Sequence, residues 1–135
     1  MLRSSGTDAY NQYIFDIAKA SKTPLNSVTT ILFNNAQASA DSTVLKTIAN
    51  AEAVFFAGGD QSDYIKYWAG TEVQSILQSK SVNITIGGTS AGCAVLGNWV
   101  YTGEVGSITS SEALANPYHR YMEISFIFSS LLFQF

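Results

Sequence analysis

A serine that lies between two glycines is the residue of this chain most suited to catalysis. It lies in Gly88-Thr89-Ser90-Ala91-Gly92, which fits the pattern Gly-x-Ser-x-Gly. In that pattern the serine occupies a sharp, strained turn between a strand and a helix, and small neighbours are needed because the turn is crowded. Ser90 is therefore the predicted nucleophile of an acyl-transfer reaction. The alternative is a tight strand–helix turn without chemistry.

A second glycine turn, Gly58-Gly59-Asp60-Gln61, follows another apolar run. Because the carboxyl ends of parallel strands meet at one edge of a sheet, where ligands bind, we expect both turns to open there. The backbone amides of Gly59 and Ala91 are the predicted pair of oxyanion donors, and Asp60 and Gln61 are predicted to bind polar groups of a substrate. Asp60 is also the expected N-cap of the next helix, which does not exclude the first role.

Strands and helices must alternate to hold these turns in place. Helical spacing and breaker residues predict helices over 7–20 (capped at Thr7-Asp8), from Asp41 or Ser42 to 48, and over 64–68, 73–77 and 90–96. Strands are predicted over 28–33, 53–57 and 82–86, and the continuous apolar run at 53–57 is typical of a strand buried on both faces. This alternation indicates an α/β fold with a mostly parallel sheet.

The composition sets limits on size and partners. The 135 residues suit one domain, and the charged share of 13% is about half the usual value, as in the interior of a larger domain. The net charge of −3 and the scattered lysines and arginines argue against a nucleic-acid partner. No apolar stretch reaches the length of a membrane span, so no membrane partner is expected. The cellular compartment and the oligomeric state, including a homo-oligomer, are left open.

Cofactor signals are absent from the sequence. There is no histidine and cysteine cluster of the kind that binds a metal, and Gly58-Gly59 lacks the spacing of a dinucleotide loop. No cofactor and no metal are therefore expected. Cys93 is interpreted as a small buried helix residue. The glycosylation sequon at Asn83 is expected to be unmodified, because it falls in a predicted buried strand.

The two glycine turns together resemble the cyanophycinase branch of the serine peptidases, which includes dipeptidase E. Segments 4–11 and 111–118 are similar to the same family, so the resemblance covers about residues 3 to 123. It implies a three-layer sandwich like class I glutamine amidotransferases. It also implies a Ser–His–acid mechanism with an acyl-enzyme on Ser90. The substrate it implies is a peptide or a β-aspartyl-type amide.

The resemblance also indicates what this sequence does not provide. The family's base histidine lies in an Asp-x-His segment further downstream, and the only histidine here is His119, which we interpret as a loop residue or, alternatively, as a substitute base. The family's first strand and glycine-rich turn are also missing, since the chain starts at the end of what should be the second strand, so the sandwich is predicted to be incomplete. A catalytically inactive fragment or pseudoenzyme that acts as a binding module is therefore the alternative function. An unrelated α/β-hydrolase with the same elbow is a third possibility.

The chain is divided into a partial hydrolase domain at 1–123 and an apolar, divergent tail at 124–135. The tail contains no charged residue. It is interpreted either as a buried strand or short helix at the edge of the domain, or as an aberrant terminus from intron or shifted-frame translation.

Overall fold

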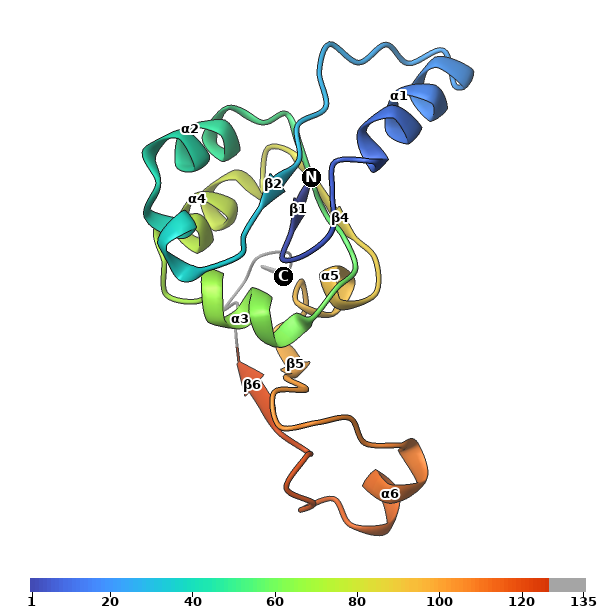
Figure 1. Ribbon diagram of the computed structural model, residues 1–135, viewed down its shortest axis with the longest axis vertical. Helices are drawn as coiled ribbons and strands as arrows, with labels where there is room; N and C mark the ends of the chain where they lie inside the picture. Colours follow the sequence, from blue (N-terminus) through green and yellow to red (C-terminus); the bar gives the residue numbers. More distant parts are fainter. Residues whose placement is uncertain (127–135) are drawn as a thin grey trace.

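Four short parallel strands form the central sheet of the computed structural model, which describes residues 1–126 (Figure 1). Their order is β2-β1-β3-β4. Their bounds are β1 Leu2–Arg3, β2 Ile31–Leu32, β3 Ala53–Phe56 and β4 Thr85–Gly88. A separate antiparallel pair is made by β5, Trp99–Tyr101, and β6, Ile124–Phe126.

Helices flank the parallel sheet. They are α1 Tyr10–Ala20, η1 Ala36–Ala40, α2 Ser42–Asn50, α3 Gln61–Trp68, α4 Glu72–Lys80, α5 Ala91–Ala94 and α6 Ser110–Ala115. In Figure 1, α2 and α4 lie on one side of the strands and α1 on the other. The predicted α/β fold with a parallel sheet is confirmed, and the arrangement fits a three-layer sandwich.

Local signals explain several of the helix ends. Asp41 caps α2 as predicted, since its carboxylate accepts hydrogen bonds from the amides of Thr43 and Val44 at 2.8 and 3.0 Å. Gly70, with φ +71°, separates α3 from α4. The predicted cap of the first helix is wrong. Ala9 is the N-cap of α1 and has no side chain that can cap it, and the Thr7 hydroxyl accepts only from the Ala9 amide, at 3.3 Å.

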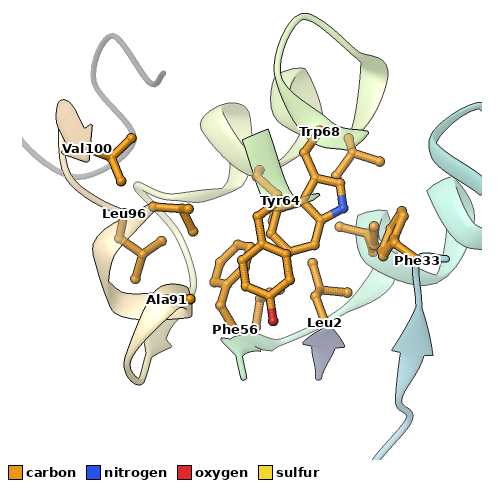
Figure 2. Close-up of a cluster of buried hydrophobic side chains, with 13 residues drawn as sticks. Leu2, Phe33, Phe56, Tyr64, Trp68, Ala91, Leu96 and Val100 are labelled. Atoms are coloured by element: carbon orange, nitrogen blue, oxygen red, sulfur yellow. The ribbon is translucent and has the colours of Figure 1, made fainter. Parts of the chain in front are cut away.

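Aromatic rings form the centre of the core. The rings of Tyr64 and Trp68 stack at 4.4 Å between centroids, and Phe33 and Phe56 each lie 5.3 Å from Trp68. Figure 2 shows these rings between β1 and α3, with Ala91 of α5 beside Phe56. Each aromatic pair stabilises the fold by about 1 kcal/mol beyond its burial. Because Tyr64 and Trp68 both belong to α3, it is the contacts of Trp68 with Phe33 and Phe56 that hold this helix against the sheet.

Strand β3 is buried on one face only, so the prediction that both faces are buried is wrong. Val54 and Phe56 are buried, whereas Phe55 is 42% exposed. The reason is that α3 and α5 pack on the Phe56 face. The opposite face borders a cavity of about 500 Å³, which Ile14 of α1 also lines.

The strand before Ser90 lies further along the chain than predicted. It covers Thr85–Gly88 rather than 82–86, because it pairs with β3 through its glycines, with Phe55 opposite Gly87. Asn83 consequently lies in an exposed turn, and the assumption that its sequon is buried is wrong. The helix predicted over 90–96 is a single turn, α5, because the chain turns again before β5.

The chain after α5 leaves the sheet. We call residues 98–126, which contain β5, α6 and β6, the arm; Figure 1 shows it extending away from the parallel strands. The first three residues of the predicted tail form β6, and the rest of that tail lies outside the described residues. Within residues 1–126, no helix has the length and apolar character needed to cross a bilayer.

Candidate active site

Ser90 has an unusual backbone conformation. Its φ of 52° and ψ of −126° lie in a region that residues other than glycine rarely adopt, which costs about 1–3 kcal/mol. Neighbouring contacts hold this conformation: the Thr89 amide donates to the Phe56 carbonyl at 3.1 Å, and the Ser90 carbonyl accepts from Cys93 and Ala94, both at 2.9 Å. Ser90 itself is exposed. The result is an exposed serine on a strained turn between β4 and α5.

The glycines around Ser90 are required by contact with neighbouring backbone. A Cβ atom added to Gly92 would lie 2.3 Å from the Phe56 carbonyl oxygen, and one added to Gly88 would lie 2.4 Å from the Gly92 carbonyl oxygen. Both positions therefore exclude any side chain unless the backbone moves. This is the crowding that the Gly-x-Ser-x-Gly pattern predicted.

The second glycine turn lies beside the serine. A Cβ atom added to Gly58 would be 3.3 Å from the Ser90 Cβ and 3.8 Å from its Oγ. The parallel pairing of β3 with β4 produces this juxtaposition, because it ends both strands at the same edge. The structure thus brings together the two turns that the sequence placed 30 residues apart.

The two expected oxyanion donors have no competing partner. Among the described residues, neither the Gly59 amide nor the Ala91 amide donates a hydrogen bond. Both amides are therefore without a partner among the described residues, and their role as oxyanion donors stays a prediction. Because α5 has only one turn, the helix dipole adds little, and the argument depends on these individual amides.

Asp60 and Gln61 are engaged within the protein. Asp60 caps α3, since its Oδ1 accepts from the Ser62 amide at 2.8 Å and the Ser62 hydroxyl at 2.7 Å. Gln61 donates from Nε2 to the Tyr101 carbonyl at 3.4 Å, which links α3 to the base of the arm. A substrate would therefore meet only the remaining oxygens of these two side chains.

Tyr64 is a residue that sequence reasoning missed at this site. Its hydroxyl donates to the carbonyls of Ala57 and Gly58 at 2.7 and 3.2 Å, and a Cβ atom on Gly59 would lie 3.0 Å from it. Burial raises the pKa of the Tyr64 phenol, and contact with Ser4 offsets this only in part. The sequence predicted a helix that contains Tyr64, but no sequence signal indicates where its hydroxyl points.

His119 lies in the arm, in the loop between α6 and β6. Its Nδ1 accepts from the Tyr121 amide at 3.2 Å, and its ring packs edge-to-face against that tyrosine at 4.9 Å. Within residues 1–126, no hydrogen bond or ring contact joins it to Ser90 or to the glycine turns. The structure therefore places His119 as a loop residue, as interpreted from the sequence.

Cys93 is exposed on α5, so its interpretation as a buried residue is wrong. The reason is the side of the turn on which it lies. Ala91 and Gly92 are buried, Cys93 and Ala94 face solvent, and the chain returns to the core at Val95 and Leu96. A thiol at this position is open to solvent.

A parallel α/β sheet with an exposed serine on a strained strand–helix turn is the architecture of hydrolases with a nucleophile elbow. The sequence model of Peptidase family S51 matches residues 4–115. The chain therefore belongs to that family, the dipeptidase E/cyanophycinase family of serine-type peptidases. A search of curated proteins gave no match.

Proposed function

We propose that Ser90 is the nucleophile of a serine-type hydrolase that cleaves a peptide or β-aspartyl-type amide. The conformation of Ser90 carries this proposal, because backbone strain at an exposed, chemically competent residue is typical of functional sites. The adjacent Gly58 turn and the free Gly59 and Ala91 amides support it. The substrate class rests on membership of family S51.

The proposed reaction follows from the positions of these groups. The Ser90 oxygen attacks the substrate carbonyl carbon, and the carbonyl oxygen takes up negative charge against the Gly59 and Ala91 amides. Collapse of this tetrahedral intermediate breaks the C–N bond and releases the amine, which takes the proton that Ser90 lost. The acyl group remains on Ser90 as an ester until water hydrolyses it.

The proton transfer needs a base that His119 does not provide from its place in the arm. A serine hydroxyl is a weak nucleophile until a base takes its proton. Loss of the histidine from a catalytic triad lowers turnover by about a millionfold, while the oxyanion hole and substrate binding still give about a thousandfold acceleration. We therefore expect slow acylation of Ser90 in the chain alone, with no burst from an activated ester.

Added imidazole tests the proposal by supplying the base. The purified chain is treated with a fluorophosphonate at several imidazole concentrations, and adducts are located by intact and peptide mass spectrometry. We expect a stoichiometric adduct on Ser90 whose rate of formation rises with imidazole, and no such adduct in Ser90→Ala. Ser79→Ala is the matched control. Ser79 is an exposed serine on α4, at the opposite end of β4, and its loss should leave the rate unchanged.

Two results would contradict the proposal. One is a folded protein that forms no Ser90 adduct at any imidazole concentration. The other is an adduct distributed equally over Ser90 and other exposed serines, because that distribution shows ordinary hydroxyl reactivity. A Ser90-dependent burst without imidazole would instead show that a base is already in place.

A binding module without catalysis is the second candidate function. The placement of His119 in the arm favours it, because the described residues bring no imidazole to the elbow. A protein that fails the imidazole test but binds uncleaved peptides or β-aspartyl amides would support this candidate. Isothermal titration with such a peptide, compared between the wild type and a Gly58→Val variant that fills the space beside Ser90, makes the distinction.

A further inference from the structure

The Tyr64 hydroxyl contacts the turn that carries one of the proposed oxyanion donors. Its single proton is shared between the Ala57 and Gly58 carbonyl oxygens, at 2.7 and 3.2 Å, and a Cβ atom added to Gly59 would lie 3.0 Å from the hydroxyl oxygen. The tyrosine is 1% exposed, and its ring is fixed by the stack on Trp68. Figure 2 shows the hydroxyl directed away from the indole. A rigid buried donor is thus aimed at two successive carbonyls of the turn.

The orientation of the Gly58 carbonyl determines the orientation of the Gly59 amide. No peptide bond in the described chain is cis, and in a trans peptide the C=O and N–H of one unit point in opposite directions. Because the Gly58 oxygen faces the buried Tyr64 phenol, the Gly59 N–H faces away from it. Ser90 lies against the Gly58 side of this turn.

A Gly-Gly peptide needs such a restraint. Neither Gly58 nor Gly59 has a side chain that limits rotation of the peptide unit between them. A reversed peptide would put the Gly58 oxygen where the Gly59 N–H now lies, and this oxygen would repel a developing oxyanion on that face. Ser4 has the other buried hydroxyl next to Gly59, but this hydroxyl has no hydrogen-bond partner among the described residues. Among these residues, Tyr64 alone holds the unit through a side chain.

We propose that Tyr64 is a positioning residue that fixes the Gly58–Gly59 peptide with its N–H available to the oxyanion formed on Ser90. This inference rests on the proposed function for its catalytic consequence. Its structural part, the direction of the Gly59 amide, stands independently. The removal of the hydroxyl should therefore change both the state of this peptide and the rate of Ser90 acylation.

Tyr64→Phe removes the hydroxyl and keeps the ring that stacks on Trp68. We expect imidazole-assisted labelling of Ser90 to slow by about tenfold to a hundredfold. This reduction in rate is no larger than the one caused by removing a whole oxyanion donor. Tyr67→Phe makes the same chemical change on the same helix and should stay within about twofold of the wild type, as should Ser4→Ala. Each rate is measured well below that variant's melting temperature.

A spectroscopic measurement reports on the Gly58–Gly59 peptide unit and does not depend on the reaction of Ser90. The chain contains only two Gly-Gly pairs, 58–59 and 87–88. Labelling glycine with ¹³C at the carbonyl and ¹⁵N therefore gives two carbonyl-to-amide cross-peaks. In Tyr64→Phe, the Gly58 carbonyl signal should move as its hydrogen bond is lost, and the Gly59 amide signal should shift or broaden. The Gly88 signal, from strand β4, is the internal reference.

The two readouts separate the possible failures. A lower melting temperature with unchanged labelling and unchanged Gly58–Gly59 signals would overturn the positioning role. Shifted signals with unchanged, Ser90-dependent labelling would overturn its catalytic consequence. If even the wild type forms no Ser90 adduct, the proposed function fails, and the nuclear magnetic resonance comparison alone decides whether Tyr64 orients the turn.

Discussion

The edge of the sheet around Ser90 and the arm differ in the kind of contact that holds each region in place. At the sheet edge, backbone atoms from distant segments touch: the Thr89 amide donates to the Phe56 carbonyl, and Gly92 packs on the same oxygen. In the arm, His119 bonds only to near neighbours, and Leu114 and Tyr118 are 85% and 94% exposed. The arm joins the body through the Gln61–Tyr101 hydrogen bond and through buried Val100.

Because of this difference, the proposed nucleophile and oxyanion donors lie in one region and the histidine lies in the other. The nucleophile and the oxyanion donors need long-range contacts, because two glycine turns from separate strands must meet. The histidine lies in a loop of the arm where its own hydrogen bonds reach only near neighbours, so no described contact directs it toward the sheet edge. If the proposed function holds, the sheet edge supplies transition-state stabilisation, and proton transfer requires another group.

The largest effect is expected at Gly92. Gly92→Ala places a Cβ atom 2.3 Å from the Phe56 carbonyl oxygen, so it should lower the free energy of unfolding by about 3 kcal/mol and abolish Ser90 labelling. Gly70→Ala is the matched control. Its added Cβ meets no atom within 4 Å, and only the positive φ of 71° opposes it, at about 1 kcal/mol. Urea titrations compare the two. Equal losses would contradict the claim that backbone contact makes Gly92 necessary.

A smaller effect concerns Tyr64 at alkaline pH. Burial raises the pKa of its phenol above the ordinary 10.0, so the folded state holds the proton more tightly than the unfolded state. The resulting stability is fully present below pH about 10 and is lost as the pH rises through the folded-state pKa. Tyr64→Phe should therefore lose less stability than the wild type between pH 9 and about 11. Parallel urea-midpoint curves for the two proteins would show that this phenol does not contribute.

A local effect is expected in the arm. Hydrogen bonds from Thr109, with a smaller contribution from His119, lower the pKa of Glu112 below the ordinary 4.5. The capping of α6 should thus persist above the unfolded-state pKa and disappear as the pH falls through the lower, folded-state value. Titration of the Glu112 carboxyl by nuclear magnetic resonance measures this. A Thr109→Val variant should return the midpoint toward its ordinary value, and an unchanged midpoint would contradict the cap.

The smallest expected effect is at His119 and sharpens the comparison of the two regions. His119→Ala should leave the rate of imidazole-assisted Ser90 labelling within about twofold of the wild type, because the histidine's contacts are confined to the arm. Labelling without added imidazole should be unchanged as well. A tenfold loss in either rate would show that the arm brings His119 to the sheet edge.

Much of the site was predictable because its signals are local. The Gly-x-Ser-x-Gly pattern identified the turn at Ser90, and Asp60 was expected to cap the next helix. The alternation of strands and helices predicted that the turns at Gly58 and Ser90 share one edge, because parallel strands end together. A backbone that must turn sharply leaves no room for side chains, so glycines and other small residues in the sequence mark such a turn.

The remaining features depended on which surfaces pack together. Sequence did not show that β3 buries Phe56 but leaves Phe55 half exposed, because the continuous apolar run does not specify how many layers cover it. It did not show that Cys93 faces solvent, which follows from which side of α5 packs on the sheet. The contact of Tyr64 with the Gly58 turn is of the same kind. A hydroxyl's partner is fixed by the docking of a helix on a sheet, and only the tertiary structure decides that docking.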